Sequence, residues 1–216
     1  MENCGDGKTA LARLMAGNKA FLEGRCPVAT GRAEVARLYT QGQRPCAAVL
    51  CCADSRITPE LIFCQGLGQL FSVRTAGNVV SDLELGSVEY AVTELGARLV
   101  LVLGHSGCGA VAGAMDGHGA GCMARVLEQI APSVRRAREQ AASPDRVAGL
   151  AEDFNIRNTL KLLRDDPALA GVQDLVFAAA KYDTHTGEVH ILESGVAGVW
   201  QEPSQGDALS QIVKSV

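Results

Sequence analysis

The sequence predicts a single α/β domain with a mainly parallel central β-sheet flanked by helices. Short apolar runs alternate with helical stretches from residue 46 onward, which is the order expected of strands joined by helical crossovers. The runs are apolar at almost every position, as is typical of strands that are buried on both faces. With 47% hydrophobic residues in 216 positions, the chain can bury one sizeable core. We find no internal repeat or long linker, so residues 1–216 are expected to form one domain.

The expected elements fall into three blocks. Residues 1–45 are expected to form a helical arm with helices near 8–22 and 33–40. Residues 46–195 form the α/β core, and residues 196–216 form a C-terminal tail. The core strands are expected at 47–52, 70–76 and 98–105, and the core helices at 58–65, 83–95, 108–115, 123–140 and 145–163. A hairpin over 175–194 should add an antiparallel C-terminal edge strand.

Composition excludes several classes of protein. The chain has 20 basic and 24 acidic residues, which gives a net charge of -4. It therefore lacks the excess of basic residues that is typical of proteins that bind nucleic acid or an anionic membrane. Its first residues lack a basic start and an unbroken apolar stretch, so we expect a soluble, cytoplasmic protein without a membrane segment. The sequence contains eight cysteines. Without a secretory signal, metal binding is a better explanation for some of them than disulfides.

Reactive side chains come after two of the expected strands. Cys52, Asp54 and Arg56 come directly after the first strand, and His105 and Cys108 come after the third. Functional groups in open α/β sheets gather beyond the carboxyl ends of the strands, so these residues should converge. Two thiolates and one imidazole occupy three corners of a tetrahedral Zn²⁺ site. The fourth, exchangeable position is typical of a catalytic zinc.

Each half of this pattern has a structural alternative. Gly104, Gly107 and Gly109 are expected to allow the sharp turn that aims both later ligands at one ion. A single histidine after a strand is, however, often only a hydrogen-bonded structural residue. Asp54 and Ser55 could likewise do no more than cap the helix that starts near residue 58. Capping requires neither the neighbouring cysteine nor the arginine, which favours the functional interpretation.

The two motifs together resemble the paired signature of the β-class carbonic anhydrases. The resemblance rests on C-x-D-S-R at 52–56 and H-x-x-C at 105–108, and continues through 74–78, 86–92, 104–111 and 182–192. It implies reversible hydration of carbon dioxide to bicarbonate and a proton by a zinc-bound homodimer or tetramer. One alternative is hydrolysis of carbon disulfide or carbonyl sulfide on the same scaffold. Another is a non-catalytic zinc or thiol sensor that uses Cys51, Cys64 or Cys122.

The resemblance and the chemistry of the residues assign a role to each side chain. Cys52, His105 and Cys108 would hold the zinc. Asp54 would accept a hydrogen bond from the attacking hydroxide and orient it toward carbon dioxide. An aspartate so close to a ligand can also fill the fourth metal position. Arg56, whose planar fork matches a carboxylate, would hold it away from the metal.

The substrate pocket is implied by the resemblance alone. It would contain Gln43, Phe71, Ala76 and Tyr90 and would lie across a dimer interface. Gln43, with Tyr90 as a second candidate, would then serve the neighbouring subunit's zinc. Without the resemblance, both aromatic side chains could simply belong to the core. Val49 stands where one subgroup of the family has a tryptophan beside a regulatory bicarbonate, so we expect no such bicarbonate site.

Overall fold

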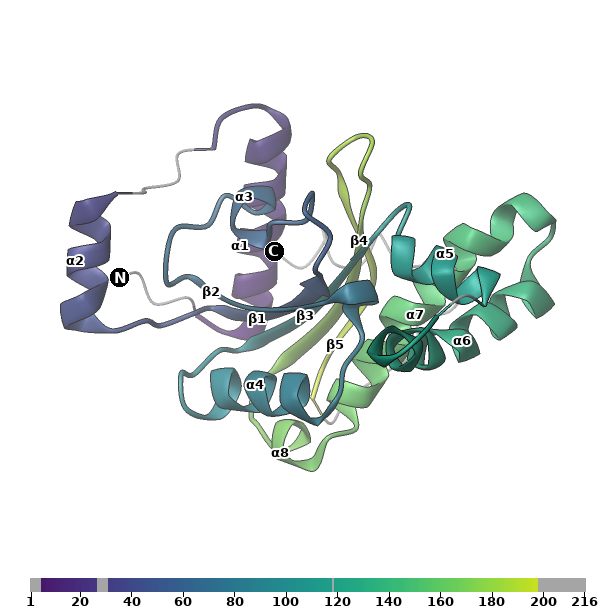
Figure 1. Cartoon of the computed structure of the whole chain (residues 1–216). Coiled ribbons are helices and arrows are strands. Elements are labelled where there is room, and N and C mark those ends of the chain that lie inside the picture. Colours follow the sequence, from purple (N-terminus) through teal and green to yellow (C-terminus); the bar gives the residue numbers. More distant parts are fainter. Residues whose placement is uncertain (1–4, 27–30, 118, 198–216) are drawn as a thin grey trace.

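The computed structural model describes residues 5–26, 31–117 and 119–197, and these form a five-stranded sheet in the order β2-β1-β3-β4-β5. The strands are β1 (Ala47–Cys52), β2 (Leu70–Thr75), β3 (Leu99–His105), β4 (Val176–Tyr182) and β5 (Val189–Val196). The first four pair in parallel, whereas β5 runs antiparallel to β4 at one edge (Figure 1). The predicted fold class, including its antiparallel C-terminal edge strand, is confirmed.

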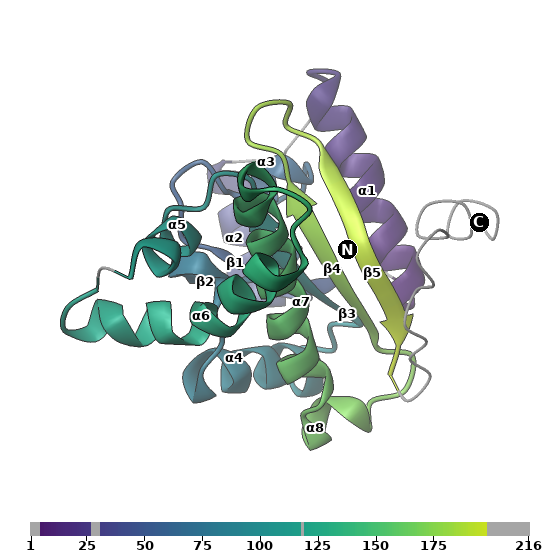
Figure 2. The same ribbon diagram turned by 90° about the vertical axis from the view of Figure 1, so that its right-hand side faces the viewer.

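Helices cover both faces of this sheet (Figures 1 and 2). They are α1 (Gly7–Leu22), α2 (Arg32–Gln41), α3 (Pro59–Ile62), α4 (Asp82–Thr93), α5 (Gly109–Asp116), α6 (Cys122–Gln140), α7 (Val147–Arg164) and α8 (Pro167–Ala170), with short 3₁₀ turns η1 (Ala76–Asn78) and η2 (Pro144–Arg146). Helices α1 and α6 contribute to the core on one face, and α4 and α8 to the core on the other. Among the described residues, no helix is both long enough and apolar enough to cross a membrane.

The two central strands explain why the sequence pattern indicated a parallel sheet. Every residue of β1 and of β3 is buried. Successive side chains point to opposite faces, so Val49 packs with Leu101 in one core cluster and Leu50 with Val102 in the other. A strand covered on both faces has to be apolar throughout.

The N-terminal region has two unlike halves. In α1, Ala10 and Leu14 are buried against the sheet, and Asn18 donates hydrogen bonds to the carbonyls of Ile62 and Gly187. Helix α2 has no buried residue and lies apart from the sheet (Figure 1). Within the predicted arm, α1 therefore packs with the α/β core and α2 alone projects from it. Residues 198–216 of the predicted tail lie outside the described part of the chain.

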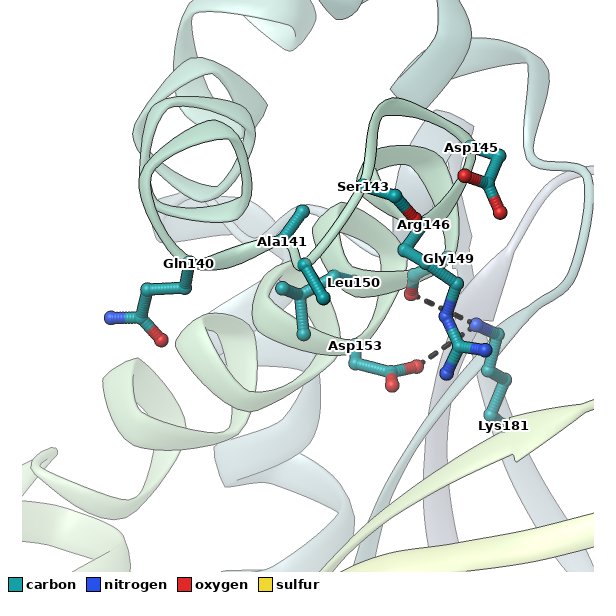
Figure 3. A pocket seen from close by; sticks show the side chains of 10 residues that line it. Gln140, Ala141, Ser143, Asp145, Arg146, Gly149, Leu150, Asp153 and Lys181 are labelled. Atoms are coloured by element: carbon teal, nitrogen blue, oxygen red, sulfur yellow. Dashed lines mark hydrogen bonds and ion pairs between the residues drawn. The ribbon is translucent and has the colours of Figure 1, made fainter.

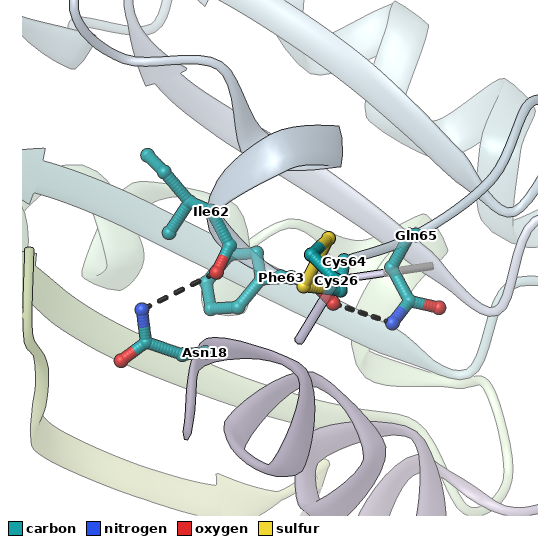
Figure 4. Close-up of a disulfide and its surroundings, with 6 residues drawn as sticks. All are labelled: Asn18, Cys26, Ile62, Phe63, Cys64 and Gln65. Carbon is teal, nitrogen blue, oxygen red and sulfur yellow. Dashed lines mark hydrogen bonds between the residues drawn. A yellow bond between two sulfur atoms is a disulfide. The ribbon is translucent and has the colours of Figure 1, made fainter. Parts of the chain in front are cut away.

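Cys26 and Cys64 form a disulfide (Figure 4). The preference for metal binding over disulfides was therefore wrong for this pair. Helix α1 packs against α3, and this contact brings the two Cα atoms within 5.3 Å across a sequence separation of 38 residues. Cysteine spacing along the chain carries no sign of this tertiary contact.

Candidate metal centre

Three potential metal ligands meet at the carboxyl edge of the sheet. Cys52 ends β1, His105 ends the neighbouring strand β3, and Cys108 precedes α5. Their ligand atoms all lie within 4.8 Å of one another. The three residues are 4%, 1% and 4% exposed, so the group is shielded from bulk water. The structure thus brings together the three side chains that the motif spacing predicted, and they can hold a metal ion.

The turn between β3 and α5 depends on glycine in two different ways. Gly107 has a φ of 68°, a left-handed conformation that other residues rarely adopt. Gly104 has no such conformation, but a Cβ atom there would lie 2.3 Å from Cγ1 of Ile156. The expectation that three glycines provide the turn is therefore right only for Gly107. Gly104 allows close packing of α7, and Gly109 shows neither feature.

The two cysteines share a strongly polarised environment. The backbone N–H groups of Asp54 and Gly77 point at Cys52 Sγ, with donor–acceptor distances of 3.5 and 3.3 Å. The thiol of Cys108 and these amides lower the pKa of Cys52 against the opposing effect of burial. The same contact with Cys52, together with burial, raises the pKa of Cys108. The two thiols therefore titrate as a coupled pair, and a metal ion that binds both sulfur atoms would displace their protons.

His105 is oriented as a metal-binding imidazole. Its Nδ1 lies 3.0 Å from the carbonyl oxygen of Ser106, which favours the tautomer with the proton on Nδ1. Its buried Nε2 makes no hydrogen bond of good geometry among the described residues and has the Cys52 sulfur as a neighbour. A buried nitrogen lone pair is costly unless something binds it. An ion between the three side chains would satisfy this atom.

Asp54 and Arg56 form a two-point ion pair beside the three ligands. The Nε and Nη2 atoms of Arg56 donate to Oδ1 and Oδ2 of Asp54, each at 2.9 Å. These bonds hold the pKa of Asp54 well below its usual value. Oδ2 of Asp54 lies 3.9 Å from Nε2 of His105, so the carboxylate borders the metal position. Helix α3 begins after its N-cap residue, Thr58. Both carboxylate oxygens of Asp54 accept hydrogen bonds from Arg56, so Asp54 does not cap this helix.

Phe71 and Tyr90 lie away from this edge. Their rings contact each other with centroids 6.1 Å apart. Phe71 stands opposite Ala48, four positions before the Thr75 that pairs with Cys52, which corresponds to about 13 Å along the strand. Tyr90 is 50% exposed. Within one chain these two predicted pocket residues do not converge on the metal ligands.

The other two predicted pocket residues occupy different places. Ala76 is exposed in the turn after β2, next to the Gly77 whose amide bonds Cys52. Gln43 is exposed in the stretch between α2 and β1. Only Ala76 of the four predicted pocket residues borders the metal edge of its own chain.

Sequence reasoning missed two residues that hold this edge in place. Glu152 in α7 is 7% exposed, and its Oε1 accepts hydrogen bonds from the amides of Gly107 at 2.8 Å and Cys108 at 3.2 Å. Arg74 donates to the Asp54 carbonyl at 2.9 Å. The available signal for Glu152 was an acidic residue among the buried positions of an amphipathic helix.

The remaining cysteines offer little support for a thiol sensor. Burial raises the pKa of Cys51 to about 12, so its thiolate is scarce at neutral pH. Cys64 is in the disulfide. Of the three cysteines proposed for sensing, Cys122 is the exposed free thiol.

Comparison with known proteins identifies the family. The sequence profile of the carbonic anhydrase family matches residues 47–189, about two thirds of the chain and a region that includes both motifs. The fold matches the β-carbonic anhydrase CafA of Aspergillus fumigatus at 26% identity, with a TM-score of 0.68 and coverage of 85% of this chain and 89% of that one. The chain belongs to the β-class carbonic anhydrase family. The fold also matches a tetrameric β-carbonic anhydrase from Sordaria macrospora with a TM-score of 0.70, covering 87% and 96% of the two chains at 23% identity.

Bacterial carbonic anhydrases give closer sequence matches. Carbonic anhydrase 2 of Mycobacterium tuberculosis is 44% identical over 135 residues, which are 60% of this chain and 65% of that protein. The match thus spans just under two thirds of the mycobacterial protein. Carbonic anhydrase of Pseudomonas aeruginosa is 30% identical over 183 residues, covering 75% of this chain and 80% of that protein.

Proposed function

We propose that this β-class carbonic anhydrase catalyses the reversible hydration of carbon dioxide to bicarbonate and a proton, with one Zn²⁺ held by Cys52, His105 and Cys108. The observation that carries the proposal is the convergence of these ligand atoms within 4.8 Å next to the Asp54–Arg56 pair. Two thiolates and an imidazole suit zinc, and three protein ligands leave a position for an exchangeable one. The buried Nε2 of His105, which faces the sulfur atoms of both cysteines, fits such an ion.

The chemistry divides between the ion and the chain. When bound, Zn²⁺ acidifies its water ligand and supplies a nucleophile near neutral pH. Asp54 accepts a hydrogen bond from the reacting oxygen and orients it toward the carbon of carbon dioxide. Arg56 keeps Asp54 ionised, so that this acceptor persists, and its two hydrogen bonds engage both carboxylate oxygens. We therefore propose that Asp54 remains unbound to zinc in the working enzyme.

We further propose that the chain acts as a homodimer or tetramer. Strand β2 is an edge strand of the sheet, and large apolar side chains are exposed on two helices, Val35 at 55% on α2 and Leu83 at 80% on α4. Exposed apolar surface of this kind is typical of an interface. In such an assembly Gln43 and Tyr90, together with the Phe71 that contacts Tyr90, would line the partner's substrate pocket beside the partner's Ala76.

A stopped-flow assay with a pH indicator tests the proposed activity. The zinc-loaded protein should accelerate carbon dioxide hydration between about pH 7 and pH 9, and removal of zinc by a chelator should abolish the acceleration. Folded, zinc-loaded protein without this acceleration would refute the proposal. Release of sulfide from carbon disulfide without turnover of carbon dioxide would reassign the substrate.

The cytoplasm is the proposed compartment, and the Cys26–Cys64 disulfide provides its test. Structural disulfides are uncommon in a reducing cytosol. Alkylation of thiols at the moment of cell lysis should find Cys26 and Cys64 reduced if the protein resides in the cytoplasm. Complete protection of both from alkylation would indicate an oxidising compartment.

A further inference from the structure

Lys181 lies at the centre of a partly buried ion cluster behind the metal edge. It is in β4, in register with Gly104 of β3. Its Nζ lies 2.8 Å from Glu152 Oε2, 2.9 Å from Asp153 Oδ1 and 3.1 Å from the carbonyl oxygen of Gly149. Figure 3 shows the amine between the last two of these groups. All three donors of the ammonium group are therefore used within this cluster.

Glu152 connects this cluster to the loop that carries Cys108. One carboxylate oxygen receives the ion pair from Lys181, while the other accepts the amides of Gly107 and Cys108. A single carboxylate thus joins a cation on β4 to the backbone of a metal ligand. Asp153 also pairs with Lys181, but the structure gives it no bond to either amide.

The burial of Glu152 makes its cation important. A carboxylate that is 7% exposed is costly unless it is paired and hydrogen-bonded. Lys181 supplies the pairing charge, and its own pKa shows the coupling. Burial lowers that pKa, but the bonds to Glu152 and Asp153 outweigh burial and leave it above its usual value.

We propose that Lys181 is a positioning residue of the metal centre, which fixes Glu152 so that Glu152 holds the Gly107–Cys108 backbone where Cys108 can bind the ion. The inference rests on the proposed function only in taking zinc as the ion. Removal of a residue that orients a metal ligand through hydrogen bonds commonly weakens metal binding by about 10- to 100-fold. We expect Lys181, through Glu152, to act in this range.

The surroundings of Lys181 make it suitable for substitution. Its side chain borders a cavity of about 680 Å³, lined also by Ser143, Arg146, Leu150 and Asp153 (Figure 3). A methionine of similar length can therefore adjust into this space without overpacking the core. Lys181→Met removes the charge and leaves the apolar stem.

The test is the affinity for zinc, measured by competition with a chromogenic chelator. Lys181→Met should weaken zinc binding by about tenfold or more, and Lys181→Arg should restore most of the loss. Asp153→Asn is the matched control, since it alters a partner of Lys181 that does not touch the loop. It should change the affinity by less than about threefold.

A double variant shows whether Lys181 acts through Glu152. Glu152→Gln should weaken zinc binding by itself, and Lys181→Met should then add little in that background, because coupled residues are not additive. A folded Lys181→Met protein with wild-type zinc affinity would overturn the proposal. So would an equal effect of Lys181→Met in the wild-type and Glu152→Gln backgrounds. If Lys181→Met does not fold, Lys181→Gln takes its place in the same comparisons.

This readout separates the two proposals. Zinc competition requires no turnover, so a protein that hydrates no carbon dioxide but loses zinc affinity on Lys181→Met would refute the proposed function alone. A fully active enzyme whose zinc affinity is unchanged by that substitution would refute only the positioning role.

Discussion

The metal edge and the predicted substrate pocket differ in how much of each one chain provides. At the metal edge, Cys52, His105 and Cys108 are almost fully buried, and their supporting hydrogen bonds come from the same chain. Of the predicted pocket residues, Phe71 lies about 13 Å along β2 from Thr75, the residue that pairs with Cys52. Tyr90 is 50% exposed. One chain therefore brings the three predicted metal ligands together by itself, whereas the predicted pocket residues stay apart within one chain and need the proposed second copy to meet.

Removal of a metal ligand should have the largest effect on the self-contained region. Cys52→Ser should lose bound zinc, and the rate of carbon dioxide hydration should fall by at least ~100-fold. Metal analysis and the stopped-flow assay measure the two quantities. Cys51→Ser is the matched control, because Cys51 is the adjacent buried cysteine of β1 and is not among the three converging ligands, so this variant should keep its zinc. Retention of zinc by Cys52→Ser would contradict the assigned ligand set.

The next effect separates metal binding from catalysis. Asp54→Asn should reduce kcat roughly 100-fold while zinc remains bound, because the amide no longer offers a carboxylate acceptor to the reacting oxygen. Arg56→Lys should give a smaller loss, since lysine cannot make the two-point contact. An Asp54→Asn enzyme with full kcat would show that the pair has no part in the reaction.

A mixing experiment tests whether the pocket spans two chains. Tyr90→Ala should lower kcat/KM by about tenfold, the usual order for loss of a contact of this kind. If Tyr90 serves the partner's zinc, mixing Tyr90→Ala chains with Asp54→Asn chains should restore activity. One site of each mixed dimer then has both wild-type residues.

The matched control mixes Asp54→Asn with Cys52→Ser, because these defects lie in the same half of the site and should not complement. Restoration in neither mixture would place Tyr90 in the site of its own chain and end the contrast between the two regions.

The smallest expected effect is the pH dependence that Asp54 gives to stability. Its folded pKa lies below its unfolded value, so the stabilisation is present above about pH 4 and is lost as pH falls through the folded pKa. The Arg56 side chain is 56% exposed, so we expect at most about 1 kcal/mol.

Urea unfolding at neutral and acidic pH measures this difference. The Cys52→Ser protein should be compared with the Cys52→Ser, Asp54→Asn double variant, so that loss of zinc does not contribute. A stability difference that grows on acidification would contradict the sign.

Local sequence patterns were sufficient for the sheet and for the motifs at its edge. The apolar runs of β1 and β3 had to be buried on both faces, and the loops after parallel strands lie at one edge of the sheet. That topology is why Cys52 could be expected beside His105 although the two are far apart in sequence. The helix α2 was also expected in an arm outside the core, and it does project from the sheet.

The features that sequence reasoning missed all depend on packing between distant segments. Glu152 contacts Cys108 from a helix 44 residues later, and its place among the buried positions of that helix does not reveal which segment it contacts. The Cys26–Cys64 disulfide requires α1 to lie against α3, and α1 had been expected in an arm. Gly104 looked like a turn residue, but its role is set by Ile156 of α7.

X-ray absorption at the zinc edge tests most directly whether one chain supplies three ligands and leaves the fourth position open. The wild-type protein should show two sulfur atoms at about 2.3 Å, one imidazole nitrogen at about 2.0–2.1 Å and one light atom. Because that light atom should be solvent and not Asp54, the Asp54→Asn spectrum should be the same. A shell with four protein ligands, or one that changes in Asp54→Asn, would contradict the account.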